Sequence, residues 1–206
     1  WRGLDAGDGD APPAATVPVH GPGVVDLALH PTHGAAATAG ADGTFCLVDI
    51  AAGRCLSRTA AGGPLSAARF HPDGLILCLG DRAGVVRLWD VKSLTNAASF
   101  EDHAGGGPVA GVAFSESGYH LCTLGGSGEA KVWDLRKLKA LETLQPGGGP
   151  ATAIAFDPSA RFLAAAGPSA LCVHAAKSWA VLRQVPGSGK GPGSLCFAPD
   201  CRQLVA

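Results

Sequence analysis

Residues 132–139 read Val-Trp-Asp-Leu-Arg-Lys-Leu-Lys, and their Trp-Asp pair sets the pattern of the whole chain. The same pair occurs 44 residues earlier as Trp89-Asp90, and Val48-Asp49 stands 41 residues before that. Each pair closes a short apolar run and is followed by a turn. A fixed spacing of this kind predicts an internal repeat, with one supersecondary unit in each copy.

A second sequence feature recurs at a constant distance from the first. Each pair comes 19 residues after an apolar residue that leads into a turn, namely Leu29, Phe70 and Phe114. Further copies of this lead residue, Phe156 and Phe197, continue the repeat in steps of 41 to 44 residues. In the fourth copy Val173-His174 replaces Trp-Asp, at a spacing of 17. Two markers in constant phase indicate one repeated unit along the chain.

Repeats of about 40–45 residues with Trp-Asp near the end are typical of the WD40 β-propeller, in which each repeat forms one four-stranded blade. Short apolar runs separated by Gly, Pro or Asp turns suit such a sheet. The sequence therefore predicts an all-β fold, a partial WD40 propeller of about four blades plus the start of another. The expected units are 20–59, 60–102, 103–145, 146–185 and a partial 186–206, with 1–19 holding the end of a preceding blade and a disordered Gly/Asp/Ala/Pro-rich insertion.

Composition excludes several classes of function. The 206 residues contain no Met, so we expect a piece of a longer protein. With 16 Lys and Arg against 17 Asp and Glu, no excess positive charge is present to hold a phosphate backbone, and direct nucleic-acid binding is not expected. No apolar run is long enough for a membrane helix, so no membrane contact is expected. The seven Cys contain no Cys-x-x-Cys pair, which favours free thiols over disulfides or zinc.

Several polar and aromatic residues are assigned to the scaffold. His20 and His103 precede the first strand of their repeats, where a His in WD40 proteins bonds within a His-Asp-Ser/Thr-Trp network. We expect the same structural role for the Trp-Asp residues Trp89, Asp90, Trp133 and Asp134. His30 and His33 could meet His20 on zinc, but they fall in a turn that is Pro-Asp-Gly elsewhere, so neither a metal nor a cofactor is predicted.

No catalytic residue is predicted in the chain. Nucleophilic catalysis needs a Cys or Ser with a positioned base, and none of the seven Cys stands in such a frame. Five of them lie in expected strands, where core packing is the simpler role: Cys46, Cys78, Cys122, Cys172 and Cys196. The glycine-rich segment 187–191 lacks the spacing of a phosphate-binding loop.

The two ends of a propeller, where turns from successive blades converge, are the expected working surfaces. At the end that holds His20 and His103, the candidate partner contacts are the turn residues Asp42, Asp81 and Ser127. A compact basic group, Arg136, Lys137 and Lys139, is a second candidate and is expected in a loop between blades.

Three strings point to a particular family: residues 70–76, 114–119 and, above all, 133–139 closely resemble consecutive blades of the pre-mRNA-processing factor nineteen family. The resemblance runs from about His20 to the C-terminus and is most specific between Phe70 and Thr143. The chain departs from the family in its Gly-rich segments 105–107, 147–149 and 187–193, which fall in connections between blades.

The resemblance implies a nuclear U-box E3 ubiquitin-protein ligase at the core of the spliceosomal NineTeen complex, acting in pre-mRNA splicing and DNA repair. In that family a U-box recruits the conjugating enzyme, a coiled coil forms a homotetramer, and a seven-bladed WD40 domain binds substrates and spliceosomal proteins. Neither a U-box pattern nor a heptad run occurs in these residues, so we expect a non-catalytic scaffold and substrate-binding part. The alternative is a WD40 adaptor of another complex, such as a cullin-ligase substrate receptor or a cytoskeletal regulator.

Overall fold

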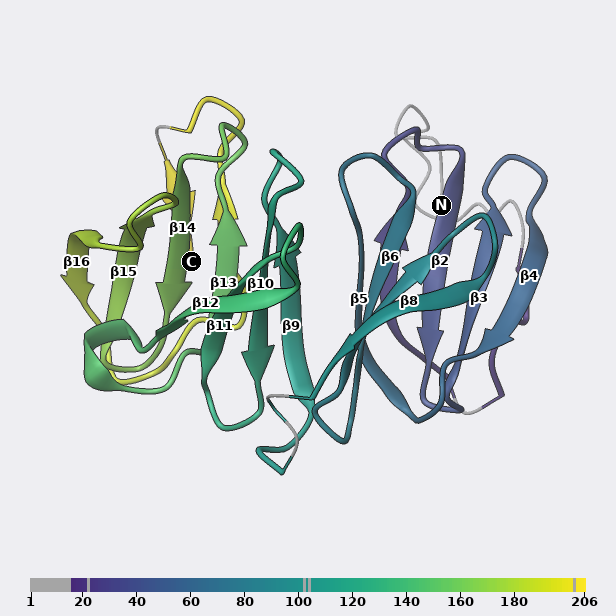
Figure 1. The fold of residues 1–206 in the computed structure, drawn as a ribbon, viewed down its shortest axis with the longest axis horizontal. Helices are drawn as coiled ribbons and strands as arrows, with labels where there is room; N and C mark the ends of the chain where they lie inside the picture. Colours follow the sequence, from purple (N-terminus) through teal and green to yellow (C-terminus); the bar gives the residue numbers. More distant parts are fainter. Residues whose placement is uncertain (1–15, 22, 102, 104, 202) are drawn as a thin grey trace, which may run out of the picture.

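Four antiparallel sheets of four strands follow one another along the chain (Figure 1). The computed structural model describes residues 16–206 apart from 22, 102, 104 and 202. The first sheet contains β1 (Val24–Leu29), β2 (Ala35–Gly40), β3 (Thr44–Asp49) and β4 (Arg54–Ala60). The second contains β5 (Leu65–Phe70), β6 (Ile76–Asp81), β7 (Val86–Asp90) and β8 (Thr95–Phe100).

The third and fourth sheets repeat this plan. The third contains β9 (Val109–Phe114), β10 (His120–Gly125), β11 (Ala130–Asp134) and β12 (Lys139–Leu144), and a 3-10 turn, η1 (Pro146–Gly148), leads on. The fourth contains β13 (Ala153–Phe156), β14 (Phe162–Ala166), β15 (Ala170–Ala175) and β16 (Val181–Pro186). A two-stranded sheet of β17 (Cys196–Phe197) and β18 (Leu204–Val205) follows.

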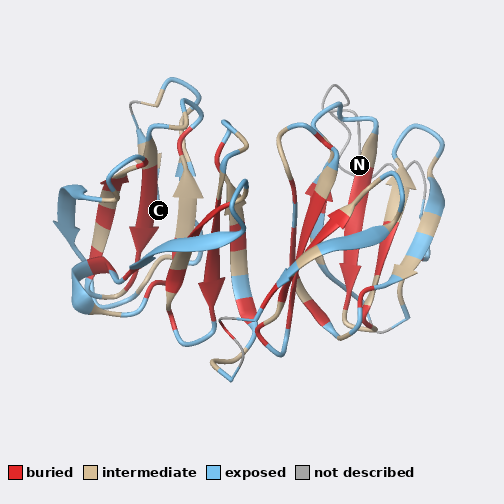
Figure 2. Ribbon diagram, in the orientation of Figure 1, coloured by how far each residue is buried: buried red, intermediate tan, exposed pale blue. Residues whose placement is uncertain are grey.

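Strand order within each sheet equals chain order, as in a meander. The first strands β1, β5, β9 and β13 lie next to one another in turn and form the inner side. The fourth strands lie outside and are largely exposed, whereas the second strands are almost wholly buried (Figure 2). These sheets are propeller blades, so the predicted all-β fold of four blades and the start of another is confirmed. The expected repeat limits stay predictions, and most of segment 1–19 lies outside the described residues.

The core lies between neighbouring sheets. The tryptophan of one blade packs on a phenylalanine of the blade before it: Trp89 meets Phe45 edge-on at 5.1 Å, and Trp133 meets Phe100 at 4.4 Å between ring centroids. Aliphatic side chains of both sheets complete each interface, as Leu65 and Leu77 do around Phe45. The phased Trp positions therefore join the blades, because a single sheet cannot bury its apolar face alone.

The turn after each first strand also joins neighbouring blades. Its fourth residue has a left-handed backbone in every repeat, with φ of 59°, 76°, 72°, 57° and 58° at His33, Gly74, Gly118, Ala160 and Cys201. At two of these turns an imidazole of the preceding blade reaches the glycine carbonyl. His30 Nε2 lies 3.1 Å from Gly74 O, and His71 Nε2 lies 2.9 Å from Gly118 O. A methyl group on either glycine would strike the imidazole ring.

Antiparallel pairing separates the turns into two groups. The turns that follow the first and third strand of each sheet share one end of the propeller, which we call the first-turn end. It lies at the top of the view in Figure 1. The turns that follow the second strands, together with His20 and His103, share the opposite end, which we call the His103 end.

Candidate functional site

At the His103 end, the third sheet carries a buried hydrogen-bond network. Thr123 of β10 is fully buried, and its Oγ1 accepts a hydrogen bond of 2.9 Å from Trp133 Nε1 on β11. The same oxygen lies 2.8 Å from His103 Nε2, in the segment that leads to β9. Because the indole donates, the threonine hydroxyl is free to donate to the imidazole. The imidazole Nδ1 faces Glu129 Oε2 at 4.0 Å, because Ser127 stands at the turn position that Asp42 holds in the first sheet.

The first sheet builds a related network without tryptophan. His20 Nε2 lies 3.0 Å from Thr38 Oγ1, while its Nδ1 lies 3.2 Å from Asp42 Oδ1 and 3.1 Å from Thr44 Oγ1. The Thr44 hydroxyl donates to Asp42 at 2.7 Å, and Arg58 pairs with Asp42 at 2.8 Å. The hydrogen bonds from Thr44, aided by His20, lower the pKa of Asp42 to about 2. This carboxylate thus already has three partners within the chain.

The second sheet replaces the network with an ion pair. Ala61 stands at the same distance before the lead residue Phe70 as His20 does before Leu29, and Asp81 stands where Gly125 does in the third sheet. Asp81 is 3% exposed; it accepts two backbone hydrogen bonds from its own turn and pairs with Arg87 at 2.6 Å. Leu79 occupies the threonine position, so Trp89 Nε1 is buried and has no hydrogen-bond partner among the residues that the structure describes. In the sequence, Asp81 stands where the third repeat has Gly125. This difference is the signal for the exchange of the network for an ion pair, and the repeat period alone does not reveal it.

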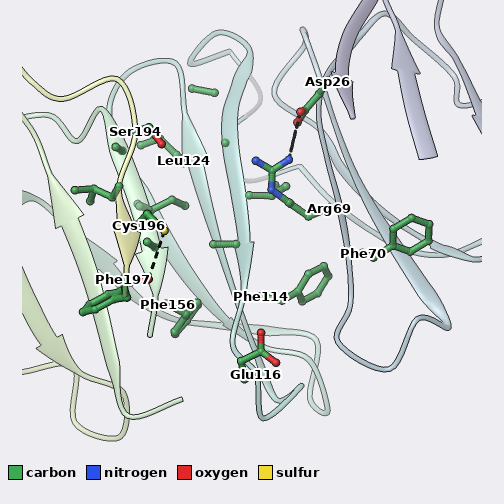
Figure 3. Close-up of a pocket in the computed structure, with 18 of the residues that line it drawn as sticks. Asp26, Arg69, Phe70, Phe114, Glu116, Leu124, Phe156, Ser194, Cys196 and Phe197 are labelled. Atoms are coloured by element: carbon green, nitrogen blue, oxygen red, sulfur yellow. Dashed lines mark hydrogen bonds and ion pairs between the residues drawn. The ribbon is translucent and has the colours of Figure 1, made fainter. Parts of the chain in front are cut away.

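A cavity of about 580 Å³ lies along the inner strands (Figure 3). Its wall combines polar and apolar atoms and includes the lead phenylalanines of four repeats, Phe70, Phe114, Phe156 and Phe197. One ion pair crosses from blade to blade, because Arg69 of β5 contacts Asp26 of β1 at 3.2 Å. Asp26 also accepts a hydrogen bond of 2.9 Å from the backbone of Ala68. Sequence reasoning did not identify this pair, since it joins residues 43 apart.

At the first-turn end, Arg136 and Lys137 lie in the turn between β11 and β12. This turn is inside the third sheet, so the expectation of a loop between blades is wrong. Buried Asp134 accepts the backbone N–H groups of both residues at 2.9 and 3.3 Å. Burial opposes its ionisation, but the hydrogen bonds from Arg136 and Lys137 prevail and lower the pKa of Asp134. The Arg136 guanidinium lies 4.7 Å above the exposed ring of Tyr119.

The predicted contact residues do not share one surface. Asp42 and Asp81 are engaged within their blades as described, whereas Ser127 is exposed in the turn between β10 and β11. Lys139 is exposed at the start of β12, at the opposite end of the molecule from these three. Asp90 begins the turn after β7, where it accepts hydrogen bonds from Ser93. Partner contact by any of these residues stays a prediction.

Metal-ligating and nucleophilic side chains are dispersed. His20 and His30 lie at opposite ends of the first sheet, and in the described part of the chain no group of three or more His, Cys, Asp or Glu could hold a metal ion. Burial raises the pKa of Cys46 to about 11 and that of Cys78 still further, which suits inert thiols. Cys196 is exposed, so its expected place in the core is wrong. No helix among the described residues could cross a membrane.

Comparison with known proteins agrees with this architecture. The family model for the WD domain, G-beta repeat, matches residues 12–49, 53–90 and 94–134, which make up more than half of the chain. The chain belongs to the WD40-repeat family.

Similarity to curated proteins shows which WD40-repeat proteins this chain resembles. The chain is 40% identical to Pre-mRNA-processing factor 19 homolog 2 of Arabidopsis thaliana over 106 residues, which is 50% of this chain and 20% of that protein. It is 39% identical to Pre-mRNA-processing factor 19 of Caenorhabditis elegans over 201 residues, which is 95% of this chain and 40% of that protein. The resemblance predicted from residues 70–139 is confirmed. The chain spans between a fifth and two fifths of the length of these relatives.

Proposed function

We propose that this chain is the WD40 scaffold of a pre-mRNA-processing factor and holds partner proteins within a splicing complex. The observation that carries the proposal is the similarity to Pre-mRNA-processing factor 19 of C. elegans, which extends over 95% of the chain. The described blades support a scaffold role, because His103, Thr123, Asp81 and Arg87 at the His103 end bond within their own sheets.

The finer proposal concerns the whole protein. On the family resemblance, it is a nuclear U-box E3 ubiquitin ligase of the NineTeen complex, homotetrameric through a coiled coil and acting in splicing and DNA repair. This chain supplies the surface for spliceosomal proteins and ubiquitination substrates. It transfers no ubiquitin itself, because that step belongs to the U-box.

The test is purification of the tagged full-length protein from nuclear extract, with partners identified by mass spectrometry. The proposal expects splicing proteins to be enriched over a mock purification with the tag alone. Enrichment of cullin subunits or cytoskeletal proteins without splicing proteins would instead favour the adaptor alternative.

Ubiquitin transfer is tested separately with purified activating and conjugating enzymes. The full-length protein is expected to form ubiquitin conjugates, and residues 1–206 alone are expected to form none above the level without ligase. Conjugates made by the isolated chain would refute its non-catalytic role, whereas an inactive full-length protein would refute the ligase proposal and leave the scaffold role intact.

A further inference from the structure

At the first-turn end, the equivalent turns of the four sheets differ in charge. In the first two sheets, the turns after the first and third strands carry one cation, Lys92, and one carboxylate, Asp73. In the third and fourth sheets the same turns carry four exposed cations, Arg136, Lys137, Arg161 and Lys177. Of the two carboxylates there, Asp157 is fully buried and only Glu116 is exposed. Turn geometry does not require this difference, because equivalent turns form without it.

Aromatic side chains lie among these cations. Tyr119 is 50% exposed and lies under Arg136 at 4.7 Å. Its neighbour His120 meets Trp179 of the fourth sheet edge-on at 5.2 Å. The N–H of Ala176, next to Lys177, donates 2.8 Å to the carbonyl of Arg161, which ties the two turns of the fourth sheet together. These contacts form a continuous basic–aromatic band, which we define as Tyr119, Arg136, Lys137, Arg161, Lys177 and Trp179.

The cations of the band are available to a ligand. The Arg136 side chain is 61% exposed, and its two contacts with Asp134 are loose, at 3.4 and 3.5 Å, which leaves further N–H donors facing solvent. Within the described residues, the ammonium groups of Lys137 and Lys177 take part in no ion pair. Asp134 and Asp157 are buried and Glu116 is exposed, so the four cations of the band outnumber the acids beside them that face solvent.

We propose that the basic–aromatic band docks an acidic, extended segment of a protein partner. Arg, Tyr and Trp are the residues that most often dominate protein interfaces. Here Arg136 stacks on Tyr119, and Trp179 contacts His120 beside it. The four cations supply complementarity to Asp and Glu side chains, and exposed Tyr119 supplies apolar contact. The inference goes beyond the proposed function, because it does not depend on which complex the chain serves.

The geometry favours a polypeptide over a single-stranded nucleic acid. Base stacking needs an open aromatic face, but Arg136 covers one face of Tyr119, and Trp179 is packed against the core formed by Leu163 and its neighbours. The chain as a whole carries a net charge of -1, so no wider positive field surrounds the band.

The binding test uses fluorescence anisotropy on residues 1–206 with a labelled synthetic peptide rich in Glu, Asp and Leu. A Lys-rich peptide and a labelled oligouridylate of similar length are the comparison probes. The triple variant Arg136→Gln/Lys137→Gln/Lys177→Gln removes three charges of the band. The matched control is Lys92→Gln, because Lys92 holds the place of Arg136 in the equivalent turn of the second sheet. Circular dichroism verifies that each variant is folded.

The wild-type chain is expected to bind the acidic peptide and not the Lys-rich one, and to bind it more weakly at high salt. The triple variant should bind about tenfold more weakly, since each exposed ion pair contributes only a small factor. Lys92→Gln should bind like wild type. Equal binding by the triple variant, equal weakening by the control, or tighter binding of oligouridylate than of peptide would each overturn the proposal. None of these results bears on co-purification with splicing proteins, so the two proposals fail separately.

Discussion

Replacing Thr123 with Val tests whether the network of the third sheet stabilises the fold. Valine has nearly the same shape, so the change removes a hydroxyl and leaves the packing in place. Two groups lose their partner, Trp133 Nε1 at 2.9 Å and His103 Nε2 at 2.8 Å, and both side chains are 3% exposed. A buried polar group left without a hydrogen bond costs about 1–3 kcal/mol. We therefore expect Thr123→Val to lower the free energy of unfolding by about 2–5 kcal/mol.

Urea denaturation followed by tryptophan fluorescence and far-ultraviolet circular dichroism measures this change. The control is Thr123→Ser, which keeps the hydroxyl and deletes one buried methyl group at a cost of about 1 kcal/mol. The reasoning requires the valine variant to be clearly less stable than the serine variant. If serine proved as damaging as valine, packing and not hydrogen bonding would explain the role of Thr123.

Three further variants or conditions probe other contacts. Gly118→Ala should lower the free energy of unfolding by about 2 kcal/mol or more, because φ is +72° and the new methyl would lie 2.8 Å from the His71 ring. Arg87→Met should cost about 3 kcal/mol, because it leaves the buried carboxylate of Asp81 without its cation. Lowering the pH from about 4 toward 2 should destabilise the chain through Asp42. The pKa of Asp42 is about 2 in the folded chain and about 3.9 in the unfolded chain. Its contribution to the free energy of unfolding is therefore complete above the unfolded pKa and is lost on acidification. Urea midpoints measure the two variants, and melting temperature against pH measures the third effect.

Each of these predictions has a control within the same repeats. Gly34→Ala meets nothing closer than 3.9 Å and should change stability by less than about 0.5 kcal/mol. Arg58→Met removes an ion pair whose arginine side chain is 53% exposed, so the free energy of unfolding should fall by less than about 1 kcal/mol. A larger loss would contradict the reasoning that the buried pair of Arg87 stabilises the fold more than the exposed pair of Arg58. Thr44→Val removes the main hydrogen bond to Asp42, so the melting temperature should depend less on pH between about 4 and 2. An unchanged pH profile would show that Asp42 does not cause the acid destabilisation.

Periodicity predicted the blades because the signals that make them are local. A lead residue, a turn and a Trp-Asp pair all lie within one repeat, and each copy supports the others. The networks around His20 and His103 lie where the phase placed those residues, since strand pairing brings the segment before β9 beside β10. The Gly-rich segment 105–107 lies in the connection between β8 and β9, where added length has little effect on the sheets.

Contacts between blades could not be predicted in the same way. Arg69 meets Asp26, and His71 meets Gly118, across gaps of 43 and 47 residues, and no feature of one repeat indicates what the next repeat places opposite it. From the sequence alone, the basic group at Arg136 is expected in a loop between blades. It lies instead in a tight turn inside the third sheet, held by the carboxylate of Asp134.

Departures between repeats carry the functional information that the period itself lacks. The structural features that a blade needs recur along the chain: the left-handed turn conformation, the buried second strand and the aromatic contact between sheets. Where one blade departs and gains a compensating contact inside the fold, as Asp81 does with Arg87, the change is explained by stability. Of the four exposed cations in the third and fourth sheets, Arg136 contacts Asp134 and Arg161 bonds Ser159. Within the described residues, however, the ammonium groups of Lys137 and Lys177 take part in no ion pair. A departure that the fold neither needs nor neutralises is therefore best explained by something that the blade binds.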